Sequence, residues 1–158
     1  MDVLAKGSFG TVLLASFLVS ACGGGPCKTD ENRLEGSVTE TGLDITVDKV
    51  RVRKVDSMTV AIEFKHGNDI VAKVTVDIRS YVKGAEIPLS DGAVRRITSP
   101  DTAWPTRILN GGVIFDSELR TGADAAGCFN ALFEFDDGFQ RSLQGGFRAP
   151  LEDLVGAQ

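Results

Sequence analysis

The chain has 158 residues, a formal net charge of −5, three cysteines and a single histidine. Its length suits one domain with one hydrophobic core. The acidic balance argues against a protein that binds nucleic acid, and against a basic patch that docks on anionic lipid.

Residues 1–21 have the pattern of a secretory signal peptide. The first six residues contain one Lys and one Asp, and residues 7–21 carry no charge. The apolar centre, residues 9–19, is too short to cross a bilayer, which takes about 20 apolar residues, but it fits the apolar segment of a signal peptide. The sequence therefore predicts export.

The end of this segment resembles the lipobox of bacterial lipoproteins. Val19-Ser20-Ala21-Cys22 places an aliphatic residue and two small residues before a cysteine. The resemblance implies that Cys22 carries a lipid on its sulfur, that the leader is removed before it, and that the new amine is acylated, for example with palmitate. Because Gly23 is not Asp, the resemblance also implies the outer membrane of a Gram-negative bacterium. An ordinary secretory signal cut after Ala21 is the alternative.

The other two cysteines are expected to form a disulfide. If Cys22 is lipidated, Cys27 and Cys128 remain in an oxidising compartment, where a bridge is the default. It would close a loop of about 100 residues, worth roughly 4–5 kcal/mol in the chain-entropy account. A metal site is the alternative, but two distant cysteines and the lone His66 make a poor ligand set, and no metal is expected.

Three segments follow from these patterns. Residues 1–21 form the signal peptide, residues 22–33 a lipidated Gly-rich tether, and residues 34–158 a single domain. In that domain short β-branched and aromatic runs alternate with Gly, Asp, Asn and Pro, which indicates an all-β fold. We expect an antiparallel β-sandwich of roughly 7–9 strands, with an eight-stranded antiparallel β-barrel as the alternative.

The first half of the domain shows four strand patterns. They lie at residues 34–39, 45–55, 60–64 and 70–78. In the second, Val50 and Val52 alternate with arginines that would face solvent. The last two would form a hairpin across the turn at residues 66–69, with Phe64 roughly opposite Ile70.

The middle of the domain is less regular. Short strands are expected near residues 86–89, 93–97 and 106–109, followed by a turn at 110–112. Residues 149–158 could make one short turn of helix after Pro150.

The clearest hairpin is predicted around Asp136-Asp137-Gly138. A three-residue loop pairs Phe135 with Phe139, puts Gly138 in the left-handed region and keeps every phenylalanine of the hairpin inside. In that register Cys128 lies on the outer face opposite Gly146. Arg141 breaks this apolar alternation, because it would point inward opposite Phe133, with its guanidinium at the open end of the core.

No catalytic motif is present. His66 is interpreted as a polar turn residue, and the paired carboxylates Asp136-Asp137 and Glu152-Asp153 as solvated surface rather than as a glycosidase pair. The lone Trp104 and the weaker Tyr81 are candidates for recognition of a sugar or partner, although a Trp in a Pro-bounded loop more often plugs one end of the core.

The expected function is a membrane-anchored, non-catalytic binding or envelope-structural module without a cofactor. Its partners would be the membrane, through the lipid on Cys22, and an envelope protein or polysaccharide. A carrier of a lipid or other apolar ligand in a barrel cavity is the first alternative, and an envelope hydrolase is the second. A carrier requires a large internal cavity, whereas a binding module requires a filled core and an exposed contact surface.

Overall fold

The computed structural model describes residues 32–37, 46–96, 107–135 and 138–153. These residues contain nine strands and no helix, so the all-β prediction is confirmed. The strands are β1 (Arg33–Gly36), β2 (Lys49–Lys54), β3 (Thr59–His66), β4 (Asp69–Asp77), β5 (Glu86–Pro88), β6 (Val94–Arg95), β7 (Ile108–Phe115), β8 (Asp124–Glu134) and β9 (Gln140–Asp153).

The strands form one curled, mixed sheet in the order β5-β7-β8-β9-β2-β3-β4-β6, with β1 on β9. The purely antiparallel arrangement expected from the sequence is wrong, because the end of β9 runs parallel to β2. Pairing of β9 with β8 ends at Pro150, and pairing with β2 begins at Leu151. The helical turn expected after Pro150 is also wrong as far as Asp153, where β9 ends; residues 154–158 lie outside the described residues.

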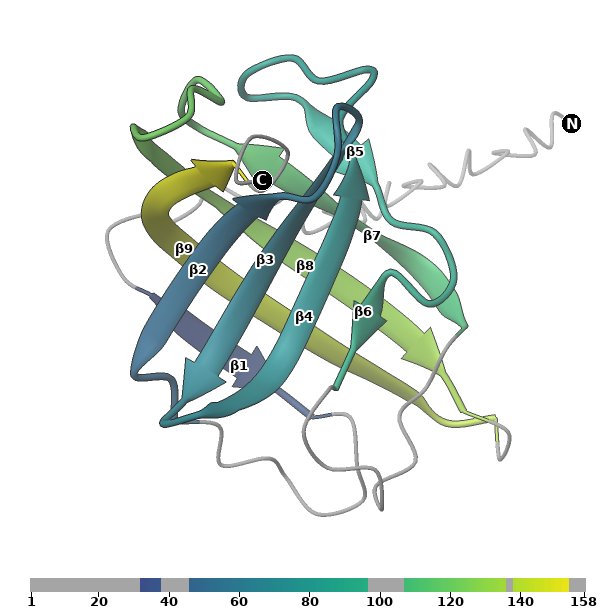
Figure 1. The fold of residues 1–158 in the computed structure, drawn as a ribbon. Helices are drawn as coiled ribbons and strands as arrows, with labels where there is room; N and C mark the ends of the chain where they lie inside the picture. Colours follow the sequence, from purple (N-terminus) through teal and green to yellow (C-terminus); the bar gives the residue numbers. More distant parts are fainter. Residues whose placement is uncertain (1–31, 38–45, 97–106, 136–137, 154–158) are drawn as a thin grey trace, which may run out of the picture.

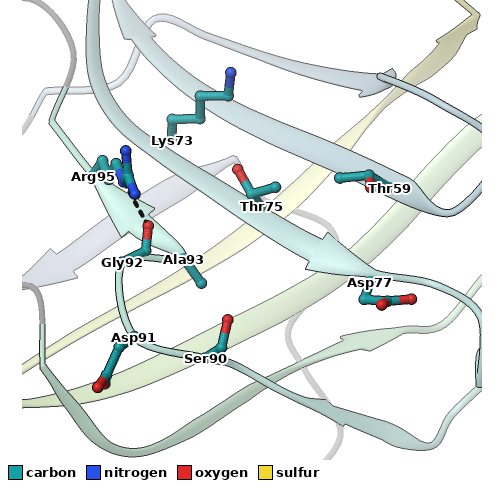
Figure 2. Close-up of a pocket in the computed structure, with 9 residues that line it drawn as sticks. All are labelled: Thr59, Lys73, Thr75, Asp77, Ser90, Asp91, Gly92, Ala93 and Arg95. Atoms are coloured by element: carbon teal, nitrogen blue, oxygen red, sulfur yellow. Dashed lines mark hydrogen bonds between the residues drawn. The ribbon is translucent and has the colours of Figure 1, made fainter.

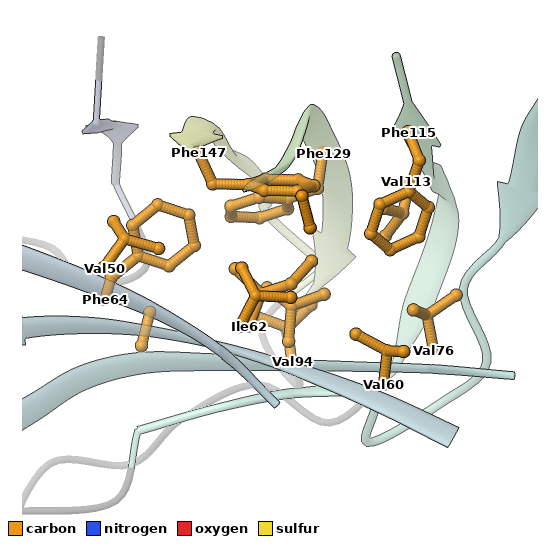
Figure 3. Close-up of a cluster of buried hydrophobic side chains, with 14 of the residues drawn as sticks. Val50, Val60, Ile62, Phe64, Val76, Val94, Val113, Phe115, Phe129 and Phe147 are labelled. Carbon is orange, nitrogen blue, oxygen red and sulfur yellow. The ribbon is translucent and has the colours of Figure 1, made fainter. Parts of the chain in front are cut away.

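The curled sheet makes two layers that cross in Figure 1. The front layer comprises β2, β3, β4, β6 and the end of β9, and the back layer comprises β1, β5, β7, β8 and the rest of β9. The space between the layers is filled by aromatic and aliphatic side chains (Figure 3). The phenylalanines in it are at most 2% exposed: Phe64, Phe115, Phe129, Phe133 and Phe147.

The β8–β9 hairpin has the predicted register. Phe135 donates its N–H to the carbonyl of Phe139 at 3.0 Å, and Gly138 has a φ of 82°. Cys128 lies opposite Gly146, and Arg141 lies opposite Phe133 with its guanidinium 5.1 Å from the centre of the Phe135 ring. One expectation fails: Phe139 is 66% exposed, because it lies at the tip of the hairpin beyond the last ladder pair.

Two other local predictions are corrected by β-bulges. In the β3–β4 hairpin Phe64 pairs with Ala72 and not with Ile70, because Val71 is an extra residue and Ile70 pairs with Lys65. Residues 110–112 form no turn but lie within β7, where the register with β8 shifts between Ile108 and Asn110. The first predicted strand begins at Arg33 and ends at Gly36, and positions 38–39 lie outside the described residues.

Candidate functional site

The outer face of the front layer is the surface of this layer that points away from the core. Because side chains alternate along a strand, Val50, Val52 and Val74 point inward and their neighbours outward. The outward set includes Arg51 and Arg53 of β2, as the sequence indicated. This surface is not fully solvated, however.

Glu63 lies on this outer face but is buried. Its side chain is 1% exposed, and it is the one polar or charged residue in the buried set of the described chain. Arg53, 22% exposed, donates a hydrogen bond to its carboxylate. Arg51 bonds instead to Glu152 of β9, at 2.5 Å from Nη2 to Oε2. The two arginines are therefore paired with carboxylates and are not simple solvent-facing residues.

The outer face carries more cations than acids. Six basic residues point from it, against three acidic ones: Lys49, Arg51, Arg53, Lys65, Lys73 and Arg95 against Glu63, Asp77 and Glu152. Like charges lie directly opposite one another at two places, Lys49 against Lys65 and Lys73 against Arg95. Directly opposed like charges are destabilising in a sheet, so these two pairs make the outer face of this acidic protein a candidate for a functional surface.

A groove of about 510 Å³ lies over this face where β4 meets β6 (Figure 2). Lys73, Thr75 and Asp77 of β4 line one side, and the segment from Ser90 to Arg95 lines the other. Arg95 Nε donates to the carbonyl of Gly92 at 2.7 Å, which holds the guanidinium over the loop. In the described part of the chain, no hydrogen bond or ion pair is made by the side chains of Lys73 or Thr75.

The acidic side of the groove is formed by Asp77 and Asp91. Arg79 donates to both carboxylate oxygens of Asp77, and these bonds lower the pKa of Asp77 below its ordinary value. Asp91 accepts the backbone N–H of Ile108 at 2.7 Å, which ties the groove loop to the start of β7. A second hollow, of about 480 Å³, adjoins at Asp77 and continues to Ile87 and Pro88.

The predicted recognition residue Tyr81 has a structural contact. Its hydroxyl donates to the carbonyl of Ser117 at 2.8 Å, and its ring packs edge-on against Phe115 with centroids 5.9 Å apart. Burial raises the pKa of Tyr81 above its ordinary value, with a smaller contribution from Glu118. The other recognition candidate, Trp104, lies outside the described residues.

Cys128 of β8 is not a free thiol. Cys22 and Cys27, the predicted lipidation site and bridge partner, lie outside the described residues, as does the pair Asp136-Asp137. The Cys27–Cys128 pairing therefore stays a prediction.

His66 lies in the exposed β3–β4 turn. Its Nδ1 is 3.2 Å from Asp48 Oδ1, and the N–H of Gly67 donates to Asp48 Oδ2 at 2.6 Å. The Gly67 bond is the largest cause that lowers the pKa of Asp48, with His66 a smaller one. The described residues contain no group of three metal-ligating side chains. The contacts of Asp48 with His66 and Gly67 stabilise the β3–β4 turn.

Sequence reasoning missed the groove. In the sequence alone, Lys73 has no feature of a binding residue, and Arg95 has the pattern of a residue on the solvent face of a strand. The available signal was a lysine inside the otherwise apolar run of β4, which marks an outward position but does not indicate what lies beside it.

No helix in the described part of the chain is long and apolar enough to cross a membrane. Comparison with known protein families, curated proteins and solved structures finds no match to this chain.

Proposed function

We propose that the chain is a lipoprotein, anchored to the cell envelope through Cys22, whose β domain is a non-catalytic binding module. The outer membrane is the expected site, and the groove between β4 and β6 is the expected contact surface for an envelope protein or polysaccharide. The observation that carries the proposal is the combination of a packed interior with an open, charged groove on the outer face.

The apolar cluster in the described interior favours this proposal over the carrier alternative. A carrier needs an apolar cavity large enough for its ligand. The five buried phenylalanines occupy the space between the two layers, and Phe64 contacts Phe129 with ring centroids 5.5 Å apart. The lining of the groove is polar and charged instead, which suits a hydrophilic partner at the surface.

The start of the domain supports the proposed link between anchor and bridge. Arg33 of β1 pairs with Gly146 from one side, and Cys128 pairs with Gly146 from the other. The chain thus enters the domain with only β9 between it and the strand of Cys128. Cys27 precedes Arg33 by only six residues. A Cys27–Cys128 bridge and a lipid on Cys22 would hold the domain close to the bilayer, because five residues span at most about 17 Å.

The intact mass of the protein extracted from its native membrane tests the anchor. We expect the mass of residues 22–158 plus a diacylglyceryl and an acyl group, with a gain of two hydrogens on reduction. A mass that includes residues 1–21, or that lacks lipid, would remove the anchor from the proposal.

Site-specific photo-crosslinking in intact cells tests the groove. A crosslinking residue at Thr75 lies in the groove, whereas one at the exposed Ser142 of β9 lies on the back layer and serves as the control. We expect a defined glycan or protein adduct from position 75 that is absent from position 142. The same products from both positions, or none from either, would contradict the proposed surface.

A further inference from the structure

We infer that the groove binds a carboxylated sugar chain, with the sugar carboxylate held between Lys73 and Arg95. This inference rests on the proposed function, because it names the chemistry of the ligand that the groove takes. Three features of the groove support it: two opposed cations without an ion pair among the described residues, groups that suit sugar hydroxyls, and a surface longer than a single ion.

The pair of cations is the starting point. Lys73 and Arg95 are direct cross-strand partners, so their Cβ atoms are separated by about 5 Å. The carboxylate nearest to Lys73 across the sheet, that of Glu63, is 1% exposed and bonded to Arg53. Among the described residues no carboxylate pairs with Lys73, and the terminal amino groups of Arg95 donate no hydrogen bond. A bound anion would relieve the repulsion between the two cations.

The Arg95 side chain is already oriented for this task. Its Nε is bonded to the carbonyl of Gly92, which leaves the two terminal amino groups as the free edge of the guanidinium. Gly92 has a φ of 73°, and a Cβ built on it would lie 2.9 Å from Arg95 Nη2. A side chain at position 92 would therefore be strained, and its Cβ would lie close to the guanidinium in the position described here.

The rest of the groove matches hydroxyl groups better than further anions. Thr59, Thr75 and Ser90 contribute hydroxyls to its lining. Asp77 and Asp91 contribute carboxylates, and each has acceptor capacity beyond the bonds described above. These carboxylates accept hydrogen bonds from sugar hydroxyls and repel an anion placed beside them, so the bound sugar carboxylate is expected at the Lys73 and Arg95 end of the groove.

The adjoining hollow extends the site beyond one sugar unit. It shares Asp77 with the groove and ends at the exposed Pro88, whose apolar ring suits the face of a sugar ring, whereas Ile87 beneath it is buried in the core. An extended peptide fits less well, because the sheet edge beside the groove is β6, whose two residues offer little backbone for an added strand to pair with. A short acidic oligosaccharide is the ligand class that uses all parts of this surface.

Binding of trigalacturonate to the purified mature lipoprotein in non-ionic detergent tests the inference. We expect binding that weakens with added salt, and about tenfold weaker binding for Lys73→Gln and for Arg95→Gln, which is about 1.4 kcal/mol each. Arg120→Gln is the matched control, because it removes the same charge from an exposed loop position outside the groove. The unfolding midpoint of Arg95→Gln should be unchanged or raised, since it removes one of two opposed like charges. That of Lys73→Gln should change little, because Lys73 also lies opposite the carboxylate of Glu63 and the two effects oppose each other.

The outcomes that would overturn the inference are distinct. Equal binding of trigalacturonate and its neutral methyl ester would exclude the carboxylate contact. An equal loss in Arg120→Gln would reduce the effect to general attraction. Binding of glycerol phosphate, the soluble headgroup of an anionic lipid, without binding of trigalacturonate would replace the sugar with a lipid headgroup. If trigalacturonate fails to bind while crosslinking at Thr75 persists, only this inference falls; if both fail, the proposed function falls as well.

Discussion

Replacing Arg53 with methionine should destabilise the fold more than replacing its partner Glu63 with methionine. The two side chains form one ion pair, but their burial differs: Glu63 is 1% exposed and Arg53 is 22% exposed. Removing one member of a buried pair costs stability mainly through the charge that stays behind. The cost should therefore follow the burial of the residue that remains.

The magnitudes can be worked from this asymmetry. In Arg53→Met the Glu63 carboxylate stays buried without its partner, which costs about 3–5 kcal/mol in comparable buried pairs. Arg51 and Lys73 lie opposite Glu63 on the adjacent strands and offer partial compensation, so we expect about 3 kcal/mol. In Glu63→Met the remaining guanidinium can reach water, and we expect only about 1–2 kcal/mol.

Urea unfolding followed by circular dichroism measures both costs. Lys65→Met is the matched control, because it removes an outer-face cation of β3 that has no ion pair in the described part of the chain, and it should change the free energy of unfolding by less than about 0.5 kcal/mol. The double variant should be less destabilised than Arg53→Met alone. Equal costs for the two single variants, or a larger cost for Glu63→Met, would refute the reasoning.

Three further predictions follow from single contacts. Burial raises the pKa of Tyr81, so the neutral tyrosine stabilises the fold fully below about pH 10, and this stabilisation is lost as the pH rises through the higher pKa of the folded state. The ultraviolet absorbance of this sole tyrosine should therefore titrate above its ordinary range. Arg51 lowers the pKa of Glu152, so Arg51→Met should lower the free energy of unfolding by less than about 1 kcal/mol at neutral pH. This cost should vanish as acid protonates Glu152 through its lowered pKa, and urea unfolding at neutral and acid pH would measure it. Gly127→Ala would place a Cβ 2.0 Å from the carbonyl oxygen of Ile114 on the neighbouring strand, so its melting temperature should fall by more than about 10 °C.

Each of these predictions has its own control. Unfolding the protein should return the tyrosine titration to its ordinary range, and a folded titration already in that range would contradict the first prediction. A cost of Arg51→Met that persists in strong acid would contradict the second. Gly122 has a φ of 81° and open space around its Cβ position, so Gly122→Ala should cost only about 1–2 kcal/mol, and an equal loss at both glycines would contradict the third.

The parts of the fold that could be predicted from the sequence are those with local causes. The β8–β9 hairpin follows from alternation of period two on both strands and from a glycine that can adopt a positive φ in the connecting loop. These signals lie within about 20 residues of one another and need no knowledge of the rest of the chain. The inward alternation of β2 and β3 was recoverable for the same reason.

The errors have causes outside the local pattern. Nothing near Leu151 indicates that this residue pairs with Val52, about 100 positions away, so the parallel contact could not be foreseen. The bulge at Val71 leaves no clear mark in a run of alternating apolar residues, yet it moves Ile70 from opposite Phe64 to opposite Lys65. The burial of Glu63 depends on its neighbours on two adjacent strands, and alternation alone predicts a solvated carboxylate there.

Apart from Arg141 and Phe139 at the end of the β8–β9 hairpin, the deviations from local rules discussed above lie on the outer face of the front layer. A buried carboxylate at Glu63 and two pairs of directly opposed cations each cost stability, and simple hydrophobic or polar substitutions would remove that cost. The inner face of the same strands has no comparable anomaly, since its residues form a regular apolar core. Costs confined to one surface are expected where that surface is kept for binding, because a site for an anionic ligand must hold its cations unneutralised until the ligand arrives. The ligand proposed above would account for the arrangement of Lys73 beside Arg95.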